Sequence, residues 1–147
     1  MKKKDLKFYG EYFGSTLPIG KIGDKTIRLA IVSLYASLAS PYKQLMSEME
    51  AVRTALVAGH EAEIAEYAKL MESGETEKAN AMTECARING DYVEAVNKML
   101  DEEANVDVKR VPLFTLIDAL ADCGYPALNP NAGLADIANL FRAVIDE

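Results

Sequence analysis

A short turn between two long helical patterns is the feature of this sequence that most constrains its fold. Apolar residues recur at helical spacing over residues 41–73 and again over residues 75–103. Between them, Ser73-Gly74-Glu75 leaves almost no connecting chain, and glycine commonly ends a helix. Because so short a connection makes neighbouring helices run antiparallel, the sequence predicts a long helical hairpin.

The apolar residues of the two predicted helices match each other when the chain is folded at Gly74. Paired residues then have numbers that add up to about 149, and each pair joins two apolar side chains. The pairs are Tyr67 with Met82, Ile64 with Cys85, Leu56 with Val93, Val52 with Val96, and Met49 with Leu100. This agreement favours the hairpin, which would be about 45 Å long at about 1.5 Å per residue.

Gly59 and Gly90 fall at the same level of the predicted hairpin. Glycine inside a helix costs up to about 1 kcal/mol relative to alanine, so two at one level need a reason. One reading is that both helices break there, which would give four shorter helices. A second reading is close packing of the two backbones. The third makes Gly59 and Gly90 hinge candidates that let residues 60–89 move against the base of the hairpin.

Another helix is predicted before the hairpin. Its apolar stripe covers residues 27–38, and Asp24 is a suitable N-cap for it. Serine followed by proline is typical of the start of a new helix, and Ser40-Pro41 has this pattern. We therefore expect one helix to end near residue 39 and the next to begin at Pro41.

The C-terminal part, residues 104–147, is expected to hold two shorter helices at about 113–123 and 134–145. Residues 106–110 alternate between apolar and polar, which predicts a short strand that could pair with the N-terminal segment. With the hairpin, these elements predict a single domain over residues 1–147 that is mainly all-α.

The N-terminal residues 1–23 lack clear helical periodicity and contain four glycines and a proline, which predicts an irregular or short-β arm. A hairpin over residues 19–27 is an alternative. The arm combines aromatic with basic side chains, and its candidate interaction residues are Lys4, Lys7, Phe8, Tyr9, Tyr12 and Phe13. The aromatic rings could pack on the domain's own core, insert into a groove on another subunit, or stack on the bases of a nucleotide.

Charge is unevenly distributed along the chain. The net charge is −7 overall, with +4 over residues 1–40, −8 over 41–103 and −3 over 104–147. An acidic hairpin argues against nucleic-acid binding by most of the domain. The basic N-terminal part permits contact between head and body, within one chain or between chains.

Three features predict a cytoplasmic protein that does not associate with membranes. No apolar run approaches the ~18 residues that a membrane span needs. The N-terminal lysines are not followed by the apolar stretch of a signal peptide. Cys85 and Cys123 stand far apart among apolar helical neighbours, which predicts buried, reduced thiols.

No pattern for catalysis, a metal or a cofactor stands out. His60 is the only histidine, so a dinuclear site built on two Glu-x-x-His motifs is excluded. No phosphate-binding loop is present. The leading hypothesis is a non-enzymatic interaction or assembly protein with a protein partner, self-associating as a homo-oligomer. Small accessory or anti-defence proteins of a phage or mobile element would have this profile.

Two alternatives follow from the charged segments. The aromatic and basic arm could make the protein a nucleotide-binding sponge or sensor. The acidic hairpin could make it a decoy that inhibits a nucleic-acid enzyme by occupying its basic surface.

Overall fold

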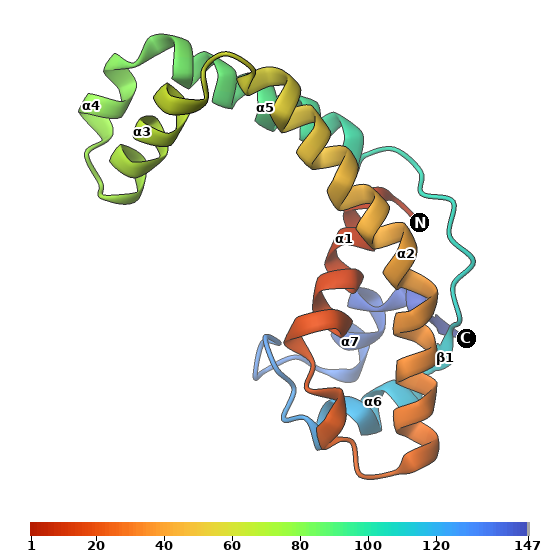
Figure 1. The fold of residues 1–147 in the computed structure, drawn as a ribbon. Coiled ribbons are helices and arrows are strands. Elements are labelled where there is room, and N and C mark those ends of the chain that lie inside the picture. The colour runs from red at the N-terminus through yellow and green to blue at the C-terminus, as the bar shows by residue number, and fades with distance from the viewer. Residues whose placement is uncertain (147) are drawn as a thin grey trace. The chain divides into compact units, whose positions relative to one another are not determined.

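A computed structural model describes residues 1–146 and is mainly α-helical, as the sequence predicts (Figure 1). The chain forms two compact units. The terminal unit consists of Met1–Leu45 and Glu103–Glu147, and the middle unit is Met46–Glu102.

The N-terminal segment is helical, so the prediction of an irregular or short-β arm is wrong. Helix α1 covers Lys3–Glu11, a π-helical turn follows at Tyr12–Thr16, and a 3₁₀ turn covers Ile19–Lys21. Leu6, Tyr9 and Phe13 lie on one side of this segment and are buried. Their burial in the core of the terminal unit outweighs the low helix propensity of the glycines, which is what misled the prediction.

Helix α2 covers Lys25–Val57 and runs through Pro41 without a break, so the predicted boundary at residues 39–41 is wrong. Proline removes one backbone donor from the helix. However, Leu34, Leu38 and Leu45 lie on one face before and after Pro41, and all three are at most 2% exposed. Their shared burial keeps the helix continuous. The predicted N-cap is confirmed, because the Asp24 carboxylate accepts a hydrogen bond of 3.0 Å from the Ile27 N–H.

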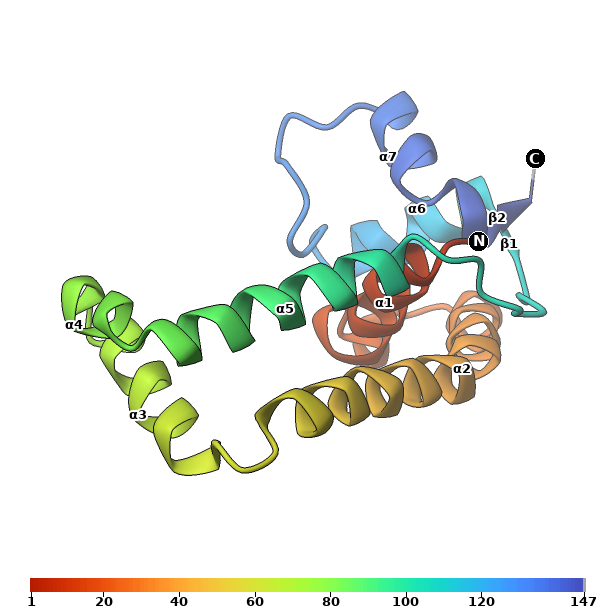
Figure 2. The same ribbon diagram turned by 90° about the horizontal axis from the view of Figure 1, so that it is seen from above.

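The C-terminal part adds two helices and a small sheet to the terminal unit (Figure 2). Helix α6 covers Leu113–Asp122 and α7 covers Leu134–Leu140, and a 3₁₀ turn follows at Arg142–Val144. Strands β1 (Val111–Pro112) and β2 (Ile145–Asp146) pair in parallel.

The strand and helix predicted near the C-terminus need correction. No strand forms at residues 106–110; it begins at Val111, and its partner is β2 rather than the N-terminal segment. Helix α7 ends at Leu140 instead of continuing to residue 145, because Val144 and Ile145 are buried and Ile145 pairs with β1. The N-terminal segment pairs with a residue that precedes β1, because Lys2 and Glu103 form an isolated antiparallel β-bridge.

The middle unit contains the end of α2 and three further helices. These are α3 (Glu61–Glu72), α4 (Thr76–Ala81) and α5 (Thr83–Leu100). The predicted turn at Gly74 is present, with φ of +79°. Two uninterrupted helices at residues 41–73 and 75–103 are not formed, because the chain also turns near Gly59 and at Met82.

The two glycines predicted as equivalent differ in the structure. Gly59 has φ of +82°, a left-handed conformation that ends α2. Gly90 lies inside α5 and causes no break. Beyond the adjoining backbone, neither position has an atom within 4 Å of the place where a Cβ would stand, so close packing of the two backbones is wrong for both. A break is confirmed only at Gly59, and hinge motion stays a prediction.

Near the turn, the residues that the predicted hairpin paired lie in one apolar cluster. Tyr67, Ala79 and Cys85 form a buried cluster against which four further side chains pack, namely Ile64, Leu70, Met82 and Ala86. The pairs Tyr67 with Met82 and Ile64 with Cys85 therefore belong to one cluster. Farther from the turn, Val93 is 48% exposed, so its predicted inward position opposite Leu56 is wrong. The bend at Gly59 interrupts the straight helix that the register assumed.

Candidate functional site

The structure brings the predicted interaction residues together on α1 and the turn after it. Tyr9, Tyr12 and Phe13 are buried, whereas the Phe8 ring is 36% exposed. All four rings contact the ring of Phe141, with centroid separations from 5.3 to 6.2 Å. Tyr9, Tyr12 and Phe13 therefore pack on the core of their own unit, which is the first of the three roles left open by the sequence.

Two tyrosine hydroxyls fix this packing. The Tyr9 hydroxyl donates to the carbonyl oxygen of Leu140 at 2.8 Å, and the Tyr12 hydroxyl donates to that of Pro126 at 2.9 Å. The buried rings of Tyr9, Tyr12 and Phe13 cannot stack on a nucleotide base while α1 stays in place, and the nucleotide-binding alternative stays a prediction. Of the two candidate lysines, Lys4 is exposed and Lys7 forms an ion pair of 2.9 Å with Glu11.

The burial of Tyr12 predicts alkaline destabilisation. Burial raises the pKa of Tyr12 to about 12 and also raises that of Tyr9. An unfolded tyrosine loses its proton near pH 10, whereas the buried Tyr12 keeps its proton to a higher pH. The contribution of the protonated Tyr12 side chain to stability is therefore complete below about pH 10, and it is lost as the pH rises toward 12. Between pH 9 and pH 11, deprotonation of Tyr12 in the unfolded chain should lower the free energy of unfolding by about 1 kcal/mol.

Urea titrations at several pH values would measure this effect. As the pH rises from 9 to 11, the free energy of unfolding should decrease less for Tyr12→Phe than for the wild type. Tyr125→Phe is the matched control because Tyr125 is 40% exposed, and it should retain the full decrease. Identical alkaline decreases in the wild type and Tyr12→Phe would contradict the prediction.

His60 and the acidic side chains were the polar groups of interest for chemistry. His60 lies at the start of α3 with its Nδ1 3.3 Å from the Glu63 carboxylate, and the two side chains are 36% and 59% exposed. Within residues 1–146, no group of three histidine, cysteine, aspartate or glutamate side chains is placed to hold a metal ion. In the same part of the chain, no helix has the length and apolar character needed to cross a bilayer.

The cysteines have different surroundings. Cys85 is buried in the cluster of the middle unit, and Cys123 is half-buried with its thiol 3.3 Å from the carbonyl oxygen of Pro18. Both are free thiols. Burial is the main cause that raises the pKa of each thiol, with nearby carboxylates adding to it. Raised pKa values leave less of the reactive thiolate at neutral pH.

Among the surface grooves of the terminal unit, one lies where the start of α6 meets the end of α7 and β2. We call it the Phe114 groove. Its volume is about 440 Å³, and it is lined by Pro112, Leu113, Phe114, Ala138, Asn139, Arg142, Ile145 and Asp146. The Phe114 side chain is 70% exposed, an unusual position for so large an apolar group. Arg142 and Asp146 place one positive and one negative charge on the same groove.

A second groove lies in the middle unit, which we call the Tyr67 groove. Its volume is about 380 Å³, and it is lined by Arg53, Val57, Ile64, Tyr67, Ala68, Met71, Ile88, Asn89 and Tyr92. These residues come from α2, α3 and α5. Val57, Tyr67 and Ile88 are buried and form an apolar floor, while Met71 is 45% exposed.

Sequence reasoning did not identify either groove. In α6, Leu116 and Leu120 are fully buried, and Phe114 lies off the stripe that they form, which is the signal in the sequence for an outward apolar residue. In α3 the sequence placed Ile64 and Tyr67 at the interface of a hairpin. The bend at Gly59 instead leaves part of that stripe open beside α5.

The chain matches no family model, and neither the curated proteins nor the solved structures include one with significant similarity to it.

Proposed function

We propose that this protein is a non-enzymatic assembly protein whose copies associate through the Phe114 groove. The observation that carries the proposal is the 70% exposure of Phe114 beside an apolar groove. Exposed aromatic residues next to a pocket are characteristic of interface anchors. The energetic gain would come from burying this ring.

The occupant that fits the groove best is a second copy of the chain. In a two-fold interface, each surface must be complementary to itself. The Phe114 groove meets this condition in two ways. It offers an apolar ring together with an apolar recess that can receive it, and it offers the positive charge of Arg142 together with the negative charge of Asp146. Phe114 of one copy would enter the groove of the other, and Arg142 would face the partner's Asp146.

Sedimentation velocity over a range of protein concentrations tests the proposal. The wild type should associate, and Phe114→Asp should remain monomeric. Leu29→Asp is the matched control because Leu29 is 56% exposed in the same unit but does not line the groove. Far-UV circular dichroism should show both variants folded. A wild type that stays monomeric at high micromolar concentration would refute the proposal.

A charge exchange tests the pairing of Arg142 with Asp146. Arg142→Glu and Asp146→Arg should each weaken association, because each places like charges opposite one another. The double variant restores opposite charges and should recover association. Failure of the double variant to recover would refute this two-fold arrangement even if Phe114→Asp is monomeric.

A further inference from the structure

The Tyr67 groove has the dimensions and lining of a site for apolar side chains. Its volume of about 380 Å³ lies within the usual range of about 300–1,000 Å³ for ligand pockets. Three elements, α2, α3 and α5, contribute its walls, and its floor is buried and apolar. Met71 on one wall is exposed and flexible, which lets such a surface adapt to the side chains of a partner.

Charge indicates which kind of partner fits. The middle unit, Met46–Glu102, carries thirteen acidic and five basic residues, a net charge of −8. The rest of the chain has a net charge of +1 by the same count. The Tyr67 groove therefore lies in the acidic part of the protein, and its partner must tolerate or complement a negative field.

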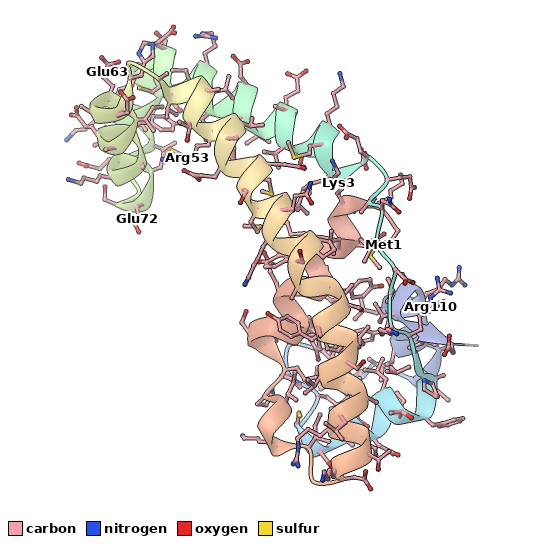
Figure 3. All side chains as sticks on the ribbon, turned by 45° about the vertical axis from the view of Figure 1, so that its right-hand side comes forward. Met1, Lys3, Arg53, Glu63, Glu72 and Arg110 are labelled. Carbon is pink, nitrogen blue, oxygen red and sulfur yellow. The ribbon has the colours of Figure 1, made fainter. Side chains whose placement is uncertain are left out.

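Individual carboxylates border the groove. Along α3, Glu61, Ala68 and Glu72 recur at intervals of seven and four residues, which places them on one face of the helix. Since Ala68 lines the groove, Glu61 and Glu72 lie along its α3 edge, and both are exposed. Figure 3 labels Glu72 at the end of α3 and Arg53 on α2. The Arg53 side chain on the α2 wall is 3.7 Å from Glu50, which offsets its positive charge.

We infer that the Tyr67 groove binds an amphipathic helix of another protein, with apolar residues facing the groove and lysine or arginine along its edges. Helix-in-groove recognition uses apolar anchors one helical turn apart in such a trough. The acidic edge would pair with basic residues of the bound helix and repel nucleic acid. This inference goes beyond self-association and does not depend on it.

A second copy of this chain is a poor occupant. Its basic helix is α1, but Leu6 and Tyr9 of α1 are buried in the terminal unit and are not available to enter a groove. The partner is therefore expected to be a different protein.

Fluorescence anisotropy with labelled synthetic peptides tests the inference on the full chain. The first peptide is an 18-residue helix with leucine on one face and lysine on the other. The second replaces every lysine with glutamate, and the third contains the residues of the first in scrambled order, which removes the apolar face. The first peptide should bind at least tenfold more tightly than either of the others.

Variants of the groove locate the site. Met71→Ser should weaken binding of the leucine–lysine peptide about tenfold. Val93→Ser is the matched control, because Val93 is similarly exposed in the same unit but does not line the groove, and it should bind as the wild type does. Glu61→Gln with Glu72→Gln should weaken binding and reduce its dependence on salt. The glutamine at 61 can still accept the hydrogen bond that Glu61 receives from the Gly59 N–H.

Three results would overturn the inference. Equal binding of the scrambled peptide would mean that charge alone attracts the probe. Equal binding of the leucine–glutamate peptide would mean that the groove takes apolar groups regardless of charge. Weaker self-association of Met71→Ser would assign the groove to a second copy. Phe114→Asp should bind the leucine–lysine peptide normally, so failure of the proposed self-association is distinguishable from failure of this inference.

Discussion

Replacing Phe141 with alanine is expected to lower the free energy of unfolding by about 4 kcal/mol. The Phe141 side chain is fully buried, and its ring contacts the rings of Phe8, Tyr9, Tyr12 and Phe13. Its removal would leave a cavity and would also remove aromatic contacts worth about 0.5–1.5 kcal/mol for each pair. Urea unfolding followed by circular dichroism would measure the loss.

The matched control is Leu29→Ala. Leu29 is a large apolar residue in the same unit but is 56% exposed, so its truncation should change stability by less than about 0.5 kcal/mol. A loss for Phe141→Ala as small as that for Leu29→Ala would contradict the ring cluster. Because small proteins are stable by only about 5–15 kcal/mol, Phe141→Ala should leave the terminal unit marginal or unfolded.

Replacing Gly10 with alanine is expected to destabilise the protein by about 2 kcal/mol, even though alanine is the better helix former. A Cβ at Gly10 would stand 2.4 Å from Cδ2, 2.5 Å from Cγ and 2.9 Å from Cβ of Tyr42. These atoms include the base of the tyrosine side chain, which cannot swing aside freely. Either α1 or α2 would therefore have to move.

Gly90→Ala is the control for this prediction, because Gly90 also lies inside a helix but has no atom within 4 Å of a new Cβ. It should stabilise the protein by about 0.5–1 kcal/mol. Residue-resolved hydrogen exchange would measure the change in stability that each substitution causes in each unit separately. If both substitutions were stabilising, the close approach of α1 to Tyr42 would be wrong.

Local pattern was sufficient to predict several elements. The helix after Asp24, the turn at Gly74 and the beginnings of α6 and α7 follow from apolar spacing, capping residues and glycine. These signals act between residues a few positions apart, so they are readable without knowing the rest of the fold. The uneven charge along the chain is likewise a property of the sequence alone.

Contacts between distant residues decided the elements that were predicted wrongly. Helix α1 forms in a glycine-rich segment because its aromatic side chains are buried against Phe141, more than a hundred residues away. At Pro41, the intrinsic penalty of about 3 kcal/mol is offset by the burial of leucines on both sides. The pairing of Val111 with Ile145 is also long-range, and neither two-residue strand has a clear signal of its own.

The candidate sites were less predictable than the helices. The sequence selected aromatic residues of the N-terminal segment, and the structure buries Tyr9, Tyr12 and Phe13. Periodicity can show that a residue belongs to an apolar stripe, but it cannot show whether another element covers that stripe. The Phe114 and Tyr67 grooves are stretches of apolar surface that remain partly uncovered.

The sequence by itself determined that this chain is mainly helical, where it turns at Gly74, and that its middle part is acidic. Only the tertiary structure decided that α2 continues through Pro41, that Gly59 rather than Gly90 ends a helix, and that the Phe114 and Tyr67 grooves stay open. The physical reason is that helix propensities differ by at most about 1 kcal/mol per residue outside proline. Burying one large apolar side chain contributes about 1.5–3 kcal/mol, so packing overrides local preference wherever the two conflict.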